Sequence, residues 1–359
     1  MNPAAPRERR LTFRSGGWVL LLALLLSLSA VAWQVAPILL HPRSRAIGDG
    51  IHRESYGFPL QPSLVPLDTV VGAGIPRDGL PALDHPEAMT AAEEEAFERA
   101  IRGRFLVGED LVVGVALGGE ARAYPLRVLN WHEVANDELG GVPIAVTYGP
   151  LCDAAVVLDR RSGGRTMRFG VSGLLYQSCP LIYDRTDGQP APSLWAPLLQ
   201  KAVIGPAAAE GRRLRLLPSA VTTWEDWRSL HPETTVLVPD RAKLKRYRRN
   251  PYQSYRGSDL LRAPVDPLPA GGAWPLKTPL LVVWTQAGPR PLPLPWLAEK
   301  TGGGGRYVLD DGGRRIPIEV RRRPLSAWIA PGAESPAPSV RCFWFAWFAT
   351  HPGARIALP

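Results

Sequence analysis

Cysteine is scarce in this sequence, which has three of them, Cys152, Cys179 and Cys342, in 359 residues. They lie far apart along the chain, and this spacing excludes the closely spaced ligand pairs of a zinc finger. Because their number is odd, at least one cysteine stays outside any disulfide within the chain. Each thiol therefore needs its own explanation.

Nucleic-acid-binding motifs are also lacking, although the formal net charge is +9. Much of this charge is local: it lies in the N-terminal arginines, in residues 241–256 and in residues 314–323. Basic clusters without such a motif are typical of solvated faces or of attraction to anionic lipid head groups. We therefore expect no nucleic-acid partner.

Charged residues are absent from residues 16–40, and this run of about 25 residues exceeds the ~20 apolar residues that span a bilayer. Four arginines precede the run, and basic residues stay on the cytoplasmic side of a membrane. We therefore expect residues 1–45 to form a single-pass anchor in the cell membrane, with the globular part on the extracytoplasmic, periplasmic side. Ala30-Val31-Ala32 leaves a cleaved signal peptide as the alternative, with the same final compartment.

Proline and glycine are abundant, with 38 and 35 residues, and they favour turns and short strands over long helices. About 300 residues follow the anchor, enough for one large domain or two smaller ones. We predict an α+β, β-rich fold in which two related small lobes carry a few short helices after one N-terminal transmembrane helix. The predicted parts are a lead-in and main lobe at 46–240, a basic linker or strap rich in proline and tyrosine at 241–275, and a second lobe at 276–359.

Local patterns predict the individual elements. Thr90 is a helix N-cap before an acidic first turn, and Gly118-Gly119 is a two-residue hairpin signal. Pro125 suits the first turn of a helix, and the apolar spacing after it predicts that this helix continues to Asp137. The predicted strands are residues 111–117, 120–124, 142–148, 154–158, 165–171 and 180–183, and the predicted helices are residues 91–101, 125–137 and 223–230.

A unit of strand, turn, strand and helix start occurs twice in the sequence. Without a gap, Leu281-Val282-Val283 aligns with Val113-Gly114-Val115. At the same offset, Leu292-Pro293-Leu294 aligns with Tyr124-Pro125-Leu126. This match indicates an internal duplication and two similar lobes. The second copy has no counterpart of Asn130-Trp131-His132-Glu133, so we expect the second lobe to be structural.

Polar residues gather in four clusters of the first lobe, near the ends of predicted strands and helices. On the predicted helix, His132 and Glu133 would direct an imidazole and a carboxylate toward the loop that ends in Cys152. These three residues are the candidate catalytic residues. The candidate ligand-binding residues are Asn130, Trp131, Asn136, Tyr148, Ser172, Tyr176, Ser178, Asp184, Arg185 and Trp195.

Each candidate also has a structural interpretation. For His132 the alternative is a hydrogen-bonded histidine in the core. Glu133 is expected to be exposed or paired with an arginine such as Arg127. Cys152 is a metal ligand, a reactive thiol, half of a disulfide or a small buried hydrophobe. Asp184-Arg185 is expected to be a structural pair at a strand end.

The motifs taken together resemble DUF3179, a family of exported bacterial and archaeal proteins. The resemblance covers most of residues 80–358 and implies an exported domain without an assigned reaction. The tail Phe343-Trp344-Phe345-Ala346-Trp347 with His351-Pro352 is similar to the C-terminal signature of that family. The other motifs are Arg122-Ala123-Tyr124-Pro125-Leu126, Asn130-Trp131-His132-Glu133, Thr147-Tyr148-x-Pro-Leu-Cys152, Phe169-Gly170-Val171-Ser172-Gly173, Tyr183-Asp184-Arg185 and Ser193-Leu194-Trp195.

Two departures from the family pattern concern cysteine. The family usually has Tyr-Cys-Pro-Leu-Cys, and Gly149 stands here at the first cysteine position. The family's Asn-Ser-Asp appears here as Gln177-Ser178-Cys179. One cysteine is thus lost and another gained, which makes a disulfide between Cys152 and Cys179 an alternative to the short-range pair in an oxidising compartment.

Three functional classes follow for the first lobe, and they leave open whether the protein is an enzyme. The first is a soft-metal site with His132 and Cys152 as ligands, for which copper or zinc is favoured. The second is an enzyme with Cys152 as nucleophile and His132 as base. The third is a non-catalytic binding or scaffolding module. The first class suits the family, whereas the glycine at position 149 favours the third class for this chain.

Overall fold

The structure is a computed structural model that describes residues 17–40, 46–186, 191–270, 272, 274–332, 337–356 and 358. Contacts divide the chain into two units, the first 46 residues and residues 47–359. The first unit contains helix α1 (Gly17–Leu40). Within the described residues, no helix combines the length and the apolar character needed to cross a membrane. The anchor stays a prediction, and the arginines before α1 lie outside the described residues.

The described part of residues 47–359 is β-rich and contains five sheets with short helices around them. The largest sheet has the order β18 (Gly288–Pro293), β17 (Pro279–Thr285), β22 (Ser339–Phe343), β8 (Ala154–Asp159), β7 (Val142–Gly149), β6 (Val134–Leu139) and β2 (Leu83–Asp84). A second sheet has the order β15 (Ala220–Thr223), β4 (Leu111–Leu117), β5 (Glu120–Pro125), β16 (Thr235–Leu237) and β3 (Ala88–Met89).

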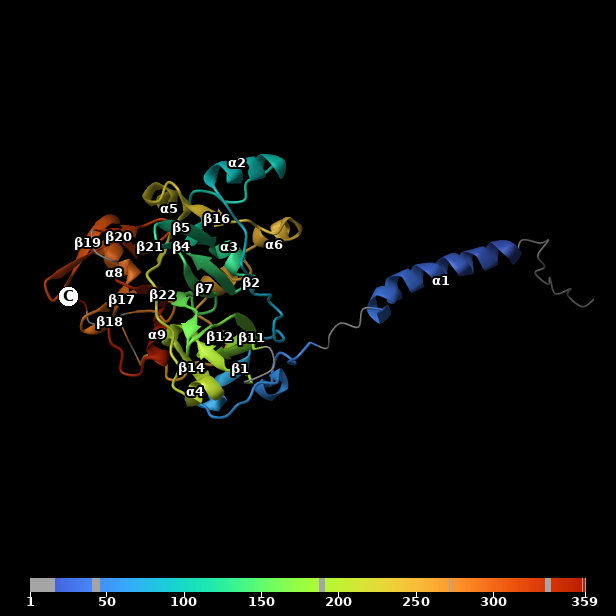
Figure 1. The fold of residues 1–359 in the computed structure, drawn as a ribbon, viewed down its shortest axis with the longest axis horizontal. Coiled ribbons are helices and arrows are strands. Elements are labelled where there is room, and N and C mark those ends of the chain that lie inside the picture. Colours follow the sequence, from blue (N-terminus) through green and yellow to red (C-terminus); the bar gives the residue numbers. More distant parts are fainter. Residues whose placement is uncertain are drawn as a thin grey trace, which may run out of the picture. The chain divides into compact units, whose positions relative to one another are not determined.

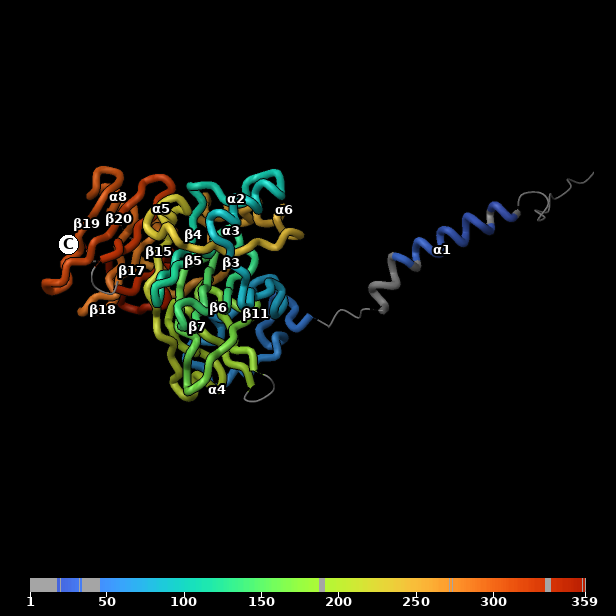
Figure 2. Tube along the Cα trace, turned by 45° about the horizontal axis from the view of Figure 1, so that its top comes forward, coloured from blue at the N-terminus to red at the C-terminus, as the bar shows by residue number. Residues whose placement is uncertain are grey.

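The remaining sheets lie on different sides of these two. β19 and β20 lie on the left of this unit and β11 on the opposite side, with β4 and β5 between them (Figures 1 and 2). These sheets are β1 (Val70–Gly72), β11 (Phe169–Tyr176), β12 (Cys179–Asp184), β13 (Leu194–Ala196) and β14 (Lys201–Ile204); β19 (Gly304–Asp311), β20 (Arg314–Arg321) and β21 (Ser326–Ile329); and β9 (Arg161–Ser162) with β10 (Arg165–Thr166).

The helices of this unit are short and occupy connections between strands. The longest begins after Thr90, whose side chain accepts a hydrogen bond from the Glu93 amide in a capping box, as predicted. The helices are α2 (Ala91–Ala100), α3 (Leu126–Leu129), α4 (Pro206–Ala209), α5 (Trp224–Leu230), α6 (Leu244–Tyr247), α7 (Gln253–Arg256), α8 (Leu294–Lys300) and α9 (Trp344–Thr350).

The predicted helix over residues 125–137 is wrong after its first turn. α3 ends at Leu129, and Glu133 has a left-handed backbone with φ of 54°, which stops helical propagation. The next residues form β6, in which Asn136 lies opposite Ala145 of β7. The predicted strand over residues 165–171 is also divided, because residues 165–166 and 169–176 belong to different sheets.

The predicted duplication has a structural counterpart, and it extends further than the sequence match. In β4 and β5, Val113 lies opposite Tyr124, and in β17 and β18 the aligned Leu281 lies opposite Leu292. A three-stranded meander follows in each copy, β6–β7–β8 in the first and β19–β20–β21 in the second. Each copy ends in a strand and a tryptophan-bearing helix, β15 with α5 and β22 with α9.

The two copies are interleaved in one unit. β22 of the second copy pairs with β8 of the first, where Arg341 lies opposite Ala155. Reciprocally, β15 of the first copy lies against β21 of the second. A single hydrophobic cluster contains Val156 from the first copy together with Val340 and Trp347 from the second. The second copy therefore completes the core of the first.

Residues 241–268, here called the strap, cross the first copy and are hydrogen-bonded to it. The Tyr255 hydroxyl donates to the Leu151 carbonyl at 2.8 Å. Further along, the Asp266 amide donates to the Gln177 side chain at 2.8 Å. The strap therefore lies over the loops that follow β7 and β11.

We predict that Gly114→Ala destabilises the protein by about 1–3 kcal/mol, because overpacking forces shifts in a filled core. An added Cβ at Gly114 would lie 2.2 Å from the Trp227 ring. Urea unfolding of the two proteins measures the loss. Gly304→Ala is the matched control, since its Cβ would have its nearest neighbour at 3.6 Å. Equal stability of Gly114→Ala and the natural protein would contradict the prediction.

Candidate functional site

A cavity of about 740 Å³ lies where the strap meets the turn between α3 and β6. The lead-in segment around Ile75 and the loop after β7 form its other walls. Apolar side chains such as Leu151 and Leu175 line much of it. Polar side chains contribute to the lining from two segments far apart in sequence, residues 130–133 and residues 252–262. Its size and its mixture of apolar and few polar groups are typical of a small-molecule site.

Glu133 is the acidic residue of this cavity, and its side chain has no hydrogen-bond or ion-pair partner among the described residues. It is only 9% exposed, and burial raises the pKa of its carboxyl to about 7. The expectation of an exposed or paired Glu133 is therefore wrong. Arg127, the suggested partner, instead pairs with Asp110 at 2.5 Å.

The backbone fixes the position of Glu133. Its amide donates to the Leu129 carbonyl at 2.8 Å, and its carbonyl accepts from the Tyr148 amide at 2.8 Å. Between these two bonds the residue has its left-handed conformation. A non-glycine residue in this region is strained and is retained where the surrounding structure imposes it, often at functional sites.

Asn130 and Trp131, two of the predicted ligand-binding residues, line the same cavity. The Asn130 Oδ1 and the Trp131 Nε1 are buried without a hydrogen-bond partner in the described part of the chain. Tyr252 of the strap lines the same cavity as Glu133. Burial, followed by the charge of Glu133, raises the pKa of the Tyr252 hydroxyl to about 12. Among these groups, the Glu133 carboxyl is the one that lines the cavity without a protein partner in the described residues.

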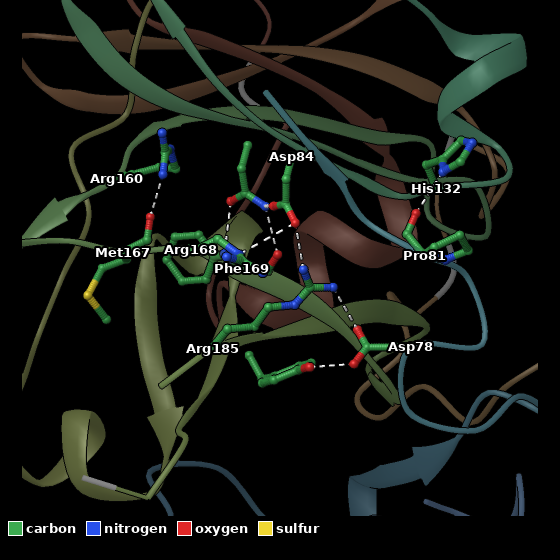
Figure 3. Close-up of polar contacts among 11 residues, drawn as sticks. Asp78, Pro81, Asp84, His132, Arg160, Met167, Arg168, Phe169 and Arg185 are labelled. Carbon is green, nitrogen blue, oxygen red and sulfur yellow. Dashed lines mark hydrogen bonds and ion pairs between the residues drawn. The ribbon is translucent and has the colours of Figure 1, made fainter. Parts of the chain in front are cut away.

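His132 has a structural role in the core. Its Nδ1 donates to the Pro81 carbonyl at 2.6 Å (Figure 3). Its Nε2 lies 2.8 Å from the Tyr247 hydroxyl. Burial lowers the pKa of the imidazole, so Nε2 is the acceptor for Tyr247. Both ring nitrogens are engaged, and the side chain does not line the cavity.

Cys152 is fully buried beside Cys179, and the structure holds both as free thiols, as it does Cys342. Burial, followed by the neighbouring Cys179, raises the pKa of the Cys152 thiol well above its ordinary value. A Cβ added at Gly149 would lie 2.8 Å from the Cys152 sulfur, so a cysteine at that position would be its immediate neighbour. The predicted disulfide between Cys152 and Cys179 stays a prediction.

The predicted helix would have directed His132 toward the loop that ends in Cys152. Leu151 of this loop and Leu175 line the cavity, whereas His132 and Cys152 do not. No hydrogen bond joins His132 to Cys152 in the described residues. Within that part of the chain, no three His, Cys, Asp or Glu side chains are grouped so that they could hold a metal ion.

Asp153 is the residue that the sequence interpretation missed. Its carboxylate is 1% exposed and accepts hydrogen bonds from Arg256 at 3.0 Å and from Arg341 at 2.7 Å. The Tyr148 hydroxyl donates to it at 2.8 Å. A sequence signal existed, because Asp153 directly follows the Gly-Pro-Leu-Cys motif and Arg341 directly precedes Cys342.

Two other predicted binding residues stabilise the lead-in segment. Arg185 pairs with Asp78 at 3.1 Å and with Asp84 at 2.8 Å (Figure 3). Asn136 donates to Asp84 and to the Phe169 carbonyl, each at 2.8 Å. Asp184 and Arg185 therefore have separate partners, because Asp184 accepts from the Ser193 amide directly before β13.

The remaining predicted binding residues have structural partners. Ser178 donates to the Ala263 carbonyl of the strap at 3.0 Å. Ser172 donates to the Leu181 carbonyl within its own sheet. Tyr176 and Trp195 belong to hydrophobic clusters. Of the predicted site residues, Asn130, Trp131 and Glu133 line the cavity.

A family model described as a protein of unknown function, DUF3179, matches residues 77–302, more than half of the chain. The match includes the cavity residues 130–133 and the strap. No curated protein and no solved structure matches the sequence.

We predict that oxidative refolding links Cys152 to Cys179, since the two thiols are neighbours and disulfides persist in oxidising compartments. Digestion without reductant after refolding in a glutathione redox buffer should give one linked peptide pair, with Cys342 alkylated separately. Cys342→Ser is the control and should keep the link. Separately alkylated Cys152 and Cys179 peptides would rule the disulfide out.

We predict that Glu133 makes stability fall as pH rises. Burial raises its pKa from the ordinary 4.5 to about 7, so the protonated form stabilises the fold fully below 4.5 and this contribution is lost as pH rises through 7. The loss is about 3 kcal/mol. Urea unfolding between pH 4 and pH 8 should show a flatter profile for Glu133→Gln, whereas exposed Glu109→Gln should keep the natural slope. Identical profiles for Glu133→Gln and the natural protein would contradict this.

Proposed function

The chain belongs to the DUF3179 family, and from its cavity we propose that it binds a small organic ligand through Glu133. The observation that carries the proposal is the buried Glu133 carboxyl, which lines the cavity and has no hydrogen-bond or ion-pair partner in the described residues. Asn130 and Trp131 line the same cavity beside it.

A buried carboxyl without a hydrogen-bond partner is costly. Nearly all buried polar groups in native proteins are hydrogen-bonded, and an unmatched one costs about 1–3 kcal/mol. A ligand in the cavity that donates to Glu133 would recover part of this cost. The volume of about 740 Å³ supports a small organic molecule as the occupant.

The other two classes have less support. Both ring nitrogens of His132 are hydrogen-bonded, and this leaves no free base for Cys152. Copper or zinc with His132 and Cys152 as ligands is not part of the proposal, because the contacts of these residues do not converge. A binding module is therefore the class that the cavity favours.

A second candidate function is acid–base catalysis by Glu133. The pKa of Glu133, about 7, suits a general acid or base at neutral pH. A bound substrate would then exchange a proton with this carboxyl. In that case ligands that bind through Glu133 are converted, and chromatography of the recovered ligand distinguishes turnover from binding.

The compartment is part of the proposal. We propose that binding takes place outside the cytoplasm, with the domain held by its N-terminal segment. The support is the order of the sequence, in which arginines precede the uncharged residues 16–40 and the globular part follows them.

We predict that a small-molecule library contains ligands that stabilise the full-length protein and depend on Glu133. Loss of a hydrogen bond to a charged group costs about 1.5–3 kcal/mol, so Glu133→Gln should weaken these ligands at least tenfold. Thermal-shift screening followed by calorimetry measures this. Glu109→Gln, a surface change of the same chemistry, should leave the affinities unchanged. Ligands that bind equally well to Glu133→Gln would contradict the proposal.

A further inference from the structure

We propose that the ligand of the Glu133 cavity is a zwitterion, with an ammonium group at Glu133 and a carboxylate or phosphate group at Arg262. This inference rests on the proposed function and specifies the chemistry of the ligand. It is carried by the acidic and the basic residue of the cavity lining, Glu133 and Arg262, neither of which has an ion-pair partner among the described residues.

The acceptor is Glu133, on the turn between α3 and β6. Its carboxyl lines the cavity and has no donor among the described residues. An ammonium group carries three hydrogens and accepts none, and its hydrogen bond to a carboxylate is strengthened by the opposite charges. The ligand group at Glu133 is therefore assigned as an ammonium group.

The donor is Arg262. It lines the cavity from the strap and has no carboxylate partner in the described part of the chain. Its guanidinium instead lies 6.0 Å from the centre of the Tyr252 ring and 5.2 Å from that of Tyr255. A guanidinium is a strong binder of carboxylate and phosphate.

Glu133 and Arg262 are the acidic and basic residues of the cavity lining. Tyr252 lines the same cavity as both, with its ring 6.0 Å from the Arg262 guanidinium, and no ion pair joins Glu133 to Arg262 in the described residues. Glu133 is buried and Arg262 is exposed, so the negative group lies deep and the positive group lies toward solvent. Apolar residues, among them Leu80 and Leu151, fill the rest of the lining and suit a hydrocarbon spacer.

The test uses three probes of similar length with the full-length protein: ε-aminocaproate carries both charges, pentylamine only the cation, and caproate only the anion. Calorimetry should show ε-aminocaproate binding at least tenfold more tightly than either single-charge probe. Glycine and γ-aminobutyrate vary the spacing between the charges and should differ from ε-aminocaproate in affinity. Equal affinity of pentylamine or caproate would overturn the inference.

Variants separate the two ends of the ligand. Glu133→Gln should weaken ε-aminocaproate and pentylamine about tenfold and leave caproate unchanged. Arg262→Gln should weaken ε-aminocaproate and caproate and leave pentylamine unchanged. Arg249→Gln, an exposed strap arginine outside the cavity lining, is the control and should change none of them. Thermal unfolding of each variant verifies that it is folded.

The outcomes distinguish this inference from the proposed function. If no zwitterionic probe binds while library ligands still depend on Glu133, the zwitterion is overturned and the binding function stands. If library ligands bind Glu133→Gln as tightly as the natural protein, both are overturned. An Arg262→Gln variant with unchanged affinity for ε-aminocaproate overturns the assignment of the anionic end.

Discussion

The buried carboxylate of Asp153 is the interaction on which the arrangement of the chain depends. It joins the loop after β7 to Arg256 of the strap and to Arg341 of β22. Removing one partner from a buried ion pair costs about 3–5 kcal/mol, because a charge is left without compensation. With Asp153 in place, three segments distant in sequence are held together, and the strap segment that carries Tyr252 and Arg262 is fixed over the cavity.

The place of Glu133 at the cavity follows from the backbone around it. The turn after α3 is held by backbone hydrogen bonds on both sides of Glu133, and these bonds fix the point from which its side chain extends. The strap covers the turn and is itself held by Tyr255 and Asp266. A carboxyl that lines a cavity without a protein partner is suited to a ligand that brings its own donor.

The duplication explains why one copy carries the cavity and the other does not. After the matching hairpin, α3 ends at Leu129 in the first copy, whereas α8 continues to Lys300 in the second. The longer helix removes the left-handed turn that aims Glu133 into the cavity. The second copy still takes part in the site's support, because it supplies Arg341 to Asp153 and β22 to the largest sheet.

The family, the β-rich class, the strand pair at 111–117 and 120–124 and the start of the duplication could all be predicted from the amino-acid sequence, because alternation and glycine turns are local signals. The sequence also singled out the segment from Asn130 to Glu133. The tertiary structure decided what those residues do: pairing of β6 with β7 replaced the predicted helix, and core contacts engaged His132. The burial of Glu133 and its approach to Tyr252 and Arg262 depend on a strap more than a hundred residues away along the chain, and local patterns carry no information about such a contact.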